Sequence, residues 1–410
     1  MRIAVHAVIL FALATTLYWG TALYFGNSAT PDTAYFNDLA DAFLHGRTYL
    51  VTPPSTHDLT AYQGRWYVPF PPLPALLMTP LVWALGLAGV NTVFFCAFFG
   101  GLNVALVFLI TTALNARGWT RLGTTDQVWL TLLFGLGSVH SYMATIGSVW
   151  FVAQVCTVTF VALAVWIAVR APWGRATPWL AGLALGCAML ARPNVAFTWP
   201  LLIGIGAMHL GSSSSSPPWR LGLTKWRALV GWTVATAIPL GLAVGALLAY
   251  NWVRFADPLD FGYRTANVAE KLVDDLRTFG QFHVHYLPKN FWAMWLAGPQ
   301  WDDAINFWLP DPEGMSLLLT TPALIYLGRA PLRNPLALGA WVAWGLLLIP
   351  LLLYYNTGWW QFGYRFSLDF MVPVLVLLAL AAGRRTSWAM RALILAGVLA
   401  NLYGVVWWHA

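Results

Sequence analysis

Long runs of apolar residues, separated by short polar stretches, make up most of this chain of 410 residues. A helix needs about 20 such residues to cross the hydrocarbon core of a bilayer, and several runs approach or exceed that length. The pattern therefore predicts an all-α polytopic membrane protein with about 11 transmembrane helices in one domain, residues 1–410. We place the spans near residues 3–25, 90–114, 127–145, 149–169, 178–191, 195–210, 228–252, 315–328, 335–355, 367–383 and 390–408.

Residues 69–88 form a further apolar run that does not fit the series of spans. Its first half is rich in proline, which lacks a backbone N–H and disfavours a continuous helix. Counting this run as a crossing would also place Arg117 and Arg121 outside and reverse every later loop. We therefore predict an interfacial or re-entrant segment, which forms part of a first extracytoplasmic loop at residues 26–89.

The charged residues agree with this topology. The chain is 59% hydrophobic and only 9% charged, whereas a soluble domain has about 25% charged residues. The inside segments hold 13 of the 22 basic residues and one acid, Asp126, and the outside holds the other 9 basic residues and 14 of the 15 acids. This bias follows the positive-inside rule, so we predict a multi-pass protein of the cell (plasma or inner) membrane with its N-terminus inside. The net charge of +7 then reflects orientation and not nucleic-acid binding.

Only the outer face has room for a polar site. Loops 26–89 and 253–314 are long, whereas the inside loops are short, and residues 211–219 (GSSSSSPPW) indicate a flexible connector. We therefore expect the active site to face outside.

The cysteines and the loop histidines give no sign of a disulfide or a metal site. The three cysteines lie inside apolar runs, as free thiols do, and the polar residues of the second loop do not match a metal template. These residues are Cys96, Cys156, Cys187, His283, His285, Asp302 and Asp303.

The first loop contains a predicted surface helix with an acid near its start. Thr30 is a suitable N-cap, Pro31 suits the first turn, and Gly46 follows the end. Asp32 would then lie in the first turn, where an acid is favoured by the helix dipole alone. The alternative is that Asp32 is a general base at the membrane surface.

Two further features of the first loop are open to two interpretations. His57 and Asp58 are adjacent, which is more typical of a turn than of a catalytic dyad. Trp66 and Tyr67 precede the proline-rich run, where they would anchor the chain at the lipid head groups or line a groove for a lipid chain.

Two arginines are poorly explained by topology. Arg192, in LARPN, is placed at the outer end of a span, where a cation is costly and suggests a functional site. The alternative is that its side chain only extends to lipid phosphates at the membrane surface. Arg365 belongs to the second of two FGYR motifs, the first of which contains Arg264. Arginine binds phosphate in a fixed bidentate geometry, and aromatic faces such as Trp359 and Tyr364 can stack on sugar rings.

These motifs together resemble the GT-C superfamily of membrane glycosyltransferases, in particular the branch of the protein O-mannosyltransferases and the aminoarabinose transferase of lipid A. The resemblance is carried by a single first span followed by PDTAYFNDLADAFLHGRTYL and RWYVPFPPLPALLMTPLVWALG, then by LARPN, YNWVRFADPLDFGYR and GWWQFGYRF. It covers most of the chain, although each motif alone is loose.

The resemblance implies a GT-C-like fold and a glycosyltransferase, hexosyl- or pentosyl-, that uses a polyprenyl-phosphate sugar as donor. It implies that Asp32 is the catalytic base and that Arg192 contacts the lipid phosphate, with Arg365 beside it. Many members have two adjacent acids at this point, whereas Thr33 follows Asp32 here, so a bound divalent metal stays open. Candidates to line the sugar and acceptor sites are Tyr35, Trp66, Tyr67, Arg264, Trp359 and Tyr364.

The competing prediction is a transporter or flippase for a lipid or small molecule. Transporters often show inverted repeats and ionisable groups near the bilayer midplane, whereas the acids here cluster outside the spans. The sequence leaves open whether the acceptor is a lipid, a glycan or a protein.

Overall fold

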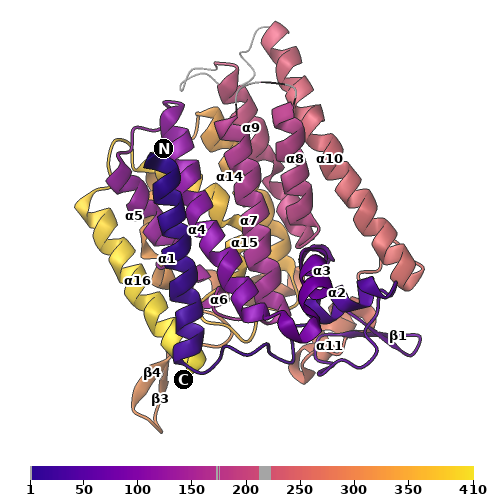
Figure 1. Ribbon diagram of the computed structural model, residues 1–410. Helices are drawn as coiled ribbons and strands as arrows, with labels where there is room; N and C mark the ends of the chain where they lie inside the picture. Colours follow the sequence, from indigo (N-terminus) through magenta and orange to yellow (C-terminus); the bar gives the residue numbers. More distant parts are fainter. Residues whose placement is uncertain (1, 172–173, 175, 212–222) are drawn as a thin grey trace.

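The structure is a computed structural model that describes residues 2–171, 174, 176–211 and 223–410. Most of the connector predicted at 211–219 lies outside the described residues. The chain forms a bundle of helices with two small hairpins at one end (Figure 1). The helices are α1 (Arg2–Tyr24), α2 (Phe36–Leu44), α3 (Leu73–Leu85), α4 (Thr92–Ala116), α5 (Thr124–Gly135), α6 (His140–Met143), α7 (Val149–Arg170), α8 (Ala176–Met189), α9 (Trp199–His209), α10 (Leu223–Phe255), α11 (Glu270–Phe279), α12 (Leu287–Trp295), α13 (Leu317–Thr320), α14 (Pro335–Leu353), α15 (Leu368–Ala381) and α16 (Trp388–His409).

Six of the described helices are long and apolar enough to cross a membrane, judged by length and composition. They are α1, α4, α7, α10, α14 and α16, and they coincide with six of the predicted spans. The prediction of an all-α membrane protein is thereby confirmed, while the count of eleven spans stays a prediction.

The other five predicted spans contain shorter or interrupted helices. α5 ends at Gly135, and α9 begins at Trp199 after a 3-10 turn over Pro193–Thr198. Residues 315–328 contain α13 and a 3-10 segment from Pro322 instead of one helix, because Pro322 cannot continue the preceding hydrogen-bond ladder. α8 and α15 have 14 residues each, and at 1.5 Å per residue they span about 21 Å.

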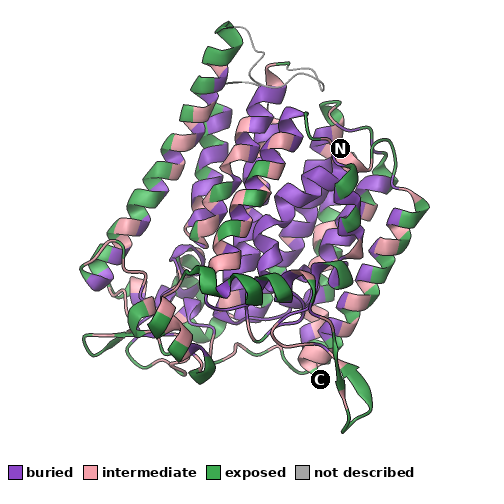
Figure 2. Ribbon diagram, turned by 180° about the vertical axis from the view of Figure 1, so that it is seen from behind, coloured by how far each residue is buried: buried purple, intermediate pink, exposed green. Residues whose placement is uncertain are grey.

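The outer faces of the peripheral helices expose large apolar residues, whereas the centre of the bundle is buried (Figure 2). Figure 2 shows buried residues through the centre and exposed residues along the outer faces of the peripheral helices. Several of these exposed residues are large and apolar, for example Leu13, Leu242 and Leu399 at 64%, 68% and 67%. Apolar surface of this kind is stable against lipid and not against water, which again indicates a membrane domain.

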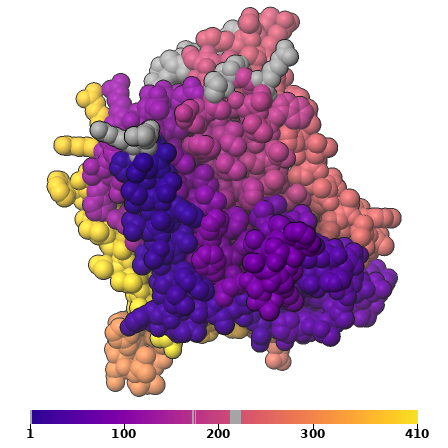
Figure 3. All heavy atoms as spheres, in the orientation of Figure 1, coloured from indigo at the N-terminus to yellow at the C-terminus, as the bar shows by residue number. Residues whose placement is uncertain are grey.

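Both long loops lie at the same end of the bundle, opposite the N-terminus (Figure 1). β1 (Thr60–Tyr62) and β2 (Arg65–Tyr67) form an antiparallel hairpin in the first loop. Gln63 and Gly64 turn it with φ values of 49° and 73°, as a two-residue hairpin loop requires. β3 (Gln300–Asp302) and β4 (Phe307–Leu309) form a second hairpin, which projects from this end of the molecule in Figure 3.

The start of the first-loop helix was predicted wrongly. α2 begins at Phe36, because Tyr35 has a φ of 45° and interrupts the helical backbone. Pro31 lies in a turn closed by a hydrogen bond from the Ala34 N–H to its carbonyl, at 3.0 Å. The Thr30 hydroxyl accepts the N–H of Thr92 at the start of α4 instead of capping its own helix.

The proline-rich run forms α3, which begins only at Leu73 and has 13 residues. At 1.5 Å per residue, α3 is about 20 Å long, shorter than the roughly 30 Å core of a bilayer. The interfacial or re-entrant placement of residues 69–88 stays a prediction with which this length agrees.

Candidate active site

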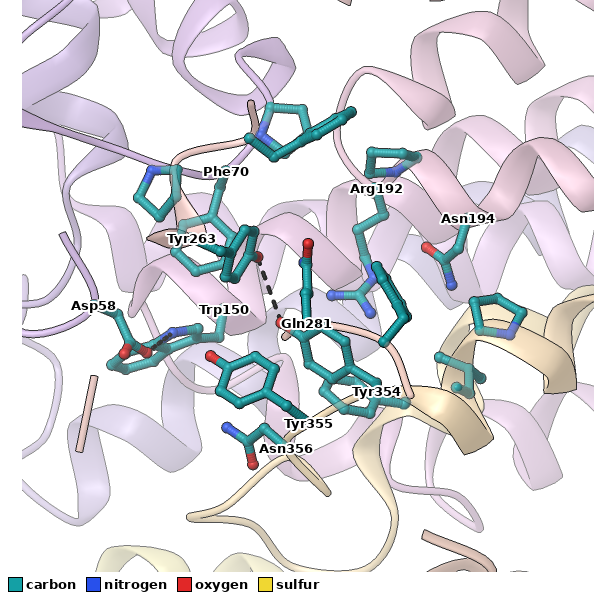
Figure 4. Close-up of a pocket in the computed structure, with 18 of the residues that line it drawn as sticks. Asp58, Phe70, Trp150, Arg192, Asn194, Tyr263, Gln281, Tyr354, Tyr355 and Asn356 are labelled. Carbon is teal, nitrogen blue, oxygen red and sulfur yellow. Dashed lines mark hydrogen bonds between the residues drawn. The ribbon is translucent and has the colours of Figure 1, made fainter. Parts of the chain in front are cut away.

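A cavity at the loop end of the bundle brings together an acid and two arginines. We call it the Asp58 cavity, and its empty volume is about 1140 Å³, open solvent at its mouth included. Apolar and aromatic side chains form most of its wall, and three charged residues line it (Figure 4). The charged residues are Asp58, Arg192 and Arg365.

Asp58 is held in the first loop by its backbone and by an indole. Its φ of 58° lies in the left-handed region, which aspartate tolerates better than most residues. Its N–H donates to the Asn267 carbonyl at 2.8 Å, and its Oδ2 accepts the Nε1–H of Trp150 at 2.9 Å. Trp150 lies in the first turn of α7, so a membrane helix fixes the direction of the carboxyl group.

The environment of Asp58 favours a carboxyl group that binds a proton more readily than usual. Burial raises the pKa of Asp58 above the ordinary aspartate value, while His57, the Trp150 hydrogen bond and Arg365 oppose the shift. A raised pKa brings a carboxylate closer to the range in which a general base works.

Arg365 is a buried cation without a carboxylate partner among the described residues. It is 5% exposed, and its side chain donates to the Gly358 carbonyl at 2.8 Å and to Gln154 Oε1 at 3.3 Å. Burial lowers the pKa of Arg365, and the nearby charge of Arg192 lowers it further. A buried charge without a partner of opposite sign is costly, and a bound anion would stabilise it.

Arg192 has a different partner, which the sequence analysis missed. Its Nη2 donates to Asp369 Oδ2 at 2.8 Å, and the amide of Asn194 donates to the same oxygen at 2.7 Å. Asp369 lies in the first turn of α15 and its side chain is 1% exposed. Arg192 Nε and Asp369 Oδ1 are buried without a hydrogen-bond partner.

The two guanidinium groups lie close together. The ring of Phe366 lies 5.1 Å from the guanidinium carbon of Arg192 and 4.9 Å from that of Arg365. Figure 4 shows Asp58 and Arg192 on opposite sides of the cavity, with Tyr263, Tyr354 and Tyr355 between them. Aromatic side chains therefore lie between the carboxyl group of Asp58 and the guanidinium group of Arg192 (Figure 4).

Asp32, the predicted base, lies outside this cavity. Its side chain is exposed in the turn before α2. The next residue, Thr33, joins the start of α7: its carbonyl accepts the Val149 N–H at 2.9 Å, and its hydroxyl donates to Ser148 at 3.0 Å. Burial, and then the charges of Asp58 and Asp32, raise the pKa of the Tyr35 hydroxyl, so both acids lie near Tyr35.

Three other predicted tyrosines are buried supports. Tyr35 donates to the His57 carbonyl at 2.7 Å, directly before Asp58, and Tyr364 donates to the Leu351 carbonyl at 3.3 Å. Tyr67 is 5% exposed and packs against Phe255. None of the three is among the residues that line the Asp58 cavity.

Trp359 lies under a cation at the edge of the site. The ammonium group of Lys271 is 3.6 Å from the centre of its ring. Trp359 follows Gly358, whose carbonyl accepts the Arg365 Nε–H. It therefore lies beside the segment that holds Arg365 and not on the cavity wall.

Trp66 and Arg264, also predicted as lining residues, meet in a second cavity. We call it the Arg264 cavity, and its empty volume is about 1490 Å³, open solvent included. It lies between the β1–β2 hairpin and the start of the second loop. The nine predicted site residues are thus divided among two cavities, their supports and one exposed turn.

The residues near Asp32 and Asp58 do not fit a divalent metal. Within the described residues, no group of three or more His, Cys, Asp or Glu side chains gathers in a way that could hold one. One oxygen of Asp58 is already bonded to the Trp150 indole, and Asp32 is followed by Thr33.

Comparison with known proteins gives a match in structure alone. No family model and no curated relative matches the sequence. The crystal structure of ArnT from Cupriavidus metallidurans, bound to undecaprenyl phosphate, matches with a TM-score of 0.51 at 14% identity. The match covers 91% of this chain and 59% of ArnT, so the chain spans less than two thirds of that protein.

Two structures of an archaeal oligosaccharyltransferase also match. The Archaeoglobus fulgidus enzyme AglB, in complex with an inhibitory peptide and a dolichol-phosphate, has a TM-score of 0.47 at 14% identity, over 97% of this chain and 56% of AglB. The same organism's enzyme tethered to an acceptor peptide has a TM-score of 0.47 at 15% identity, over 98% of this chain and 54% of the other. On the ArnT match, the chain shares the fold of ArnT.

Proposed function

We propose that this protein transfers a sugar from a polyprenyl-phosphate donor to an acceptor hydroxyl, at the outer face of the cell membrane. The observation that carries the proposal is the Asp58 cavity, where a carboxyl group with a raised pKa and two arginines line one cavity with a largely aromatic wall. The ArnT fold supports it, because that protein is bound to undecaprenyl phosphate.

The arginine side of the cavity suits the phosphate of the donor. Arg365 has no carboxylate partner among the described residues, and Arg192 keeps an unbonded Nε–H beside it. Phe70, Phe282 and Leu351 line the same cavity, and the exposed fraction of Phe282 is 52%. An apolar rim of this kind suits the first isoprene units of a lipid.

The reaction needs one base and one stabilised leaving group. The base removes the proton of the acceptor hydroxyl, whose oxygen bonds to the anomeric carbon as the bond to the phosphate oxygen breaks. The electron pair of that bond leaves on the phosphate, where Arg365 and Arg192 stabilise the added charge. Attack from the face opposite the phosphate inverts the anomeric carbon, and no paired general acid is required because the phosphate is already a good leaving group.

We propose a first-loop carboxylate as the base, for which there are two candidates. The resemblance to the GT-C family implies Asp32, which is exposed beside the start of α7. The geometry favours Asp58, because it lines the cavity that holds both arginines.

The test compares Asp32→Asn with Asp58→Asn, using purified protein and a radiolabelled polyprenyl-phosphate sugar. The variant that removes the base should lose about 10²- to 10⁴-fold in the rate of transfer while still binding undecaprenyl phosphate. We expect Asp58→Asn to have this effect. Loss in Asp32→Asn alone would assign the base to Asp32, and full activity in both variants would overturn the proposal.

A further inference from the structure

The Arg264 cavity is lined by other charged residues than the Asp58 cavity. Its polar lining comes from both long loops and includes Trp66, Asp260, Arg264, Asn267, Arg277 and Gln281. It lies at the loop end of the bundle, where water and soluble groups can enter.

The net charge of the residues that line this cavity is positive. Arg264 and Arg277 are both exposed, and within the described residues neither has a carboxylate within 4.0 Å. Asp260 is the one acid in its lining, and that carboxylate already accepts the Gly262 N–H at 2.7 Å. Two guanidinium groups around one hollow are a suitable site for a phosphate or carboxylate.

The two cavities share one wall. Phe261, Tyr263, Ala266, Val268 and Gln281 line both of them. A molecule in the Arg264 cavity is thus separated from the Asp58 cavity by single side chains.

Asp58 lies on the boundary between the cavities. The Asp58 N–H donates to the Asn267 carbonyl, and the Asn267 N–H donates to the Leu59 carbonyl, each at 2.8 Å. Asn267 lines the Arg264 cavity, whereas Asp58 lines the other. The backbone that carries the candidate base is therefore paired with the wall of the second cavity.

We propose that the Arg264 cavity binds the acceptor, and that the acceptor is a saccharide carrying a phosphate or carboxylate group. This inference rests on the proposed function and names the acceptor class for it. Arg264 and Arg277 bind the anionic group, and Trp66 offers an aromatic face for a sugar ring. The hydroxyl that reacts passes Tyr263 and Gln281 to reach Asp58 and the donor.

The first experiment measures binding of small probes to the purified full-length protein in nanodiscs of uncharged lipid. The probes are glucose 1-phosphate, glucuronate and uncharged methyl glucoside, with isothermal titration calorimetry as the readout. We expect the two anionic probes to bind and methyl glucoside to bind at least 10-fold more weakly. Arg264→Gln and Arg277→Gln should each weaken the anionic probes at least 5-fold, and the double variant more than either.

The matched control is Arg65→Gln, an exposed arginine on the same face that lies 4.4 Å from the ring of Tyr49, outside both cavities. It should bind the probes like the unaltered protein. Equal loss in all three single variants, or none in any, would overturn the proposal. The binding measurement is repeated in nanodiscs that contain anionic phosphatidylglycerol. Weaker binding of the anionic probes there would also overturn the proposal, because the arginines would then bind lipid head groups.

A second measurement separates this inference from the proposed function. Undecaprenyl phosphate should bind equally to the unaltered protein and to the Arg264 and Arg277 variants, and about 10-fold more weakly to Arg365→Gln. If Arg365→Gln binds undecaprenyl phosphate as well as the unaltered protein, the proposed donor site is wrong and the acceptor site is not affected. Unchanged probe binding in the Arg264 and Arg277 variants would count against the acceptor site alone.

Discussion

The two cavities differ in how their charges are held. In the Asp58 cavity, Arg192 and Arg365 are largely buried, and hydrogen bonds to Asp369, Gly358 and Gln154 fix their directions. In the Arg264 cavity, both arginines are exposed, and neither has a side-chain partner among the described ion pairs. Arginines held by hydrogen bonds suit one invariant group, such as the phosphate of a donor. Exposed arginines without such partners can adapt to acceptors of different shapes.

The difference predicts that substitutions of the residues that hold the buried arginines of the Asp58 cavity affect folding as well as function. The largest effect on stability should come from Asp369→Ala, because it leaves the Arg192 charge buried without its partner. Removing one member of a buried ion pair costs about 3–5 kcal/mol. Thermal unfolding in detergent should show the loss, and Arg277→Ala, in the other cavity, should leave the unfolding temperature unchanged.

A second prediction concerns the rate and not the fold. Arg365→Gln should lower the rate of transfer about 10²- to 10³-fold, as removal of one preorganised donor to a developing negative charge does. Arg365→Lys keeps the charge without the planar fork and should retain more activity than the glutamine variant. Equal activity of Gln and Lys variants would show that charge at this position does not stabilise the leaving phosphate.

Sequence reasoning found the arginines of the first cavity because a cation at the end of an apolar run is unusual. Arg192 and Arg365 both line it, and both long loops lie at one end of the bundle (Figure 1), while their side of the membrane stays a prediction. The same reasoning missed Asp369, which begins an apolar run and was read as part of a span.

The place of Asp58 in the cavity could not be predicted, for a different reason. Its surroundings include Trp150, Asn267 and Arg365, which are far from it along the chain and bring two helices and a loop around it. No local pattern reports such contacts. Asp32 was placed in a helix because Thr30 and Pro31 resemble a helix start, whereas the left-handed backbone of Tyr35 delays the helix to Phe36.

A third prediction tests the glycine that supports Arg365. Gly358 has a φ of 114°, and a Cβ at this position would lie 2.5 Å from Gln361 Oε1. Gly358→Ala should therefore cost about 1–3 kcal/mol in backbone strain and shift the carbonyl that accepts the Arg365 Nε–H. Transfer should weaken through donor binding, seen as a raised KM for the donor. Gly231→Ala, in α10 with open space around it, is the matched control and should leave the KM unchanged.

A fourth prediction concerns pH. A base works in its ionised form, and the pKa of Asp58 is raised, so Asp58 takes up its proton at a higher pH than an ordinary aspartate. The acid limb of kcat/KM should therefore lie above about pH 4, the usual aspartate pKa, and activity should be lost as the pH falls through it. Trp150→Phe removes a hydrogen bond that lowers this pKa and should move the limb to still higher pH. A limb that stays in place in Trp150→Phe would show that another group is titrating.

The smallest expected effect tests whether the second loop holds the Arg365 segment. Glu313 bonds to Lys271 and accepts the Thr357 hydroxyl at 2.6 Å, next to Gly358. Burial raises the pKa of Glu313, but the bonds from Lys271 and Thr357 outweigh it and hold the pKa below the ordinary value. Because the pKa of Glu313 is lower in the folded protein than in the unfolded chain, its ionised carboxylate stabilises the fold at any pH above the unfolded pKa. This stability is lost as the pH falls through the pKa of Glu313 in the folded protein.

Glu313→Gln should therefore destabilise the protein at pH 7 by about 0.2–1 kcal/mol, the range of exposed ion pairs, and by less below pH 4. Thermal unfolding at both pH values measures the difference. Because Thr357 adjoins the glycine whose carbonyl orients Arg365, the same variant should weaken undecaprenyl phosphate binding while leaving glucose 1-phosphate binding in the Arg264 cavity unchanged. Equal weakening of both ligands would mean that the two cavities are not independently supported.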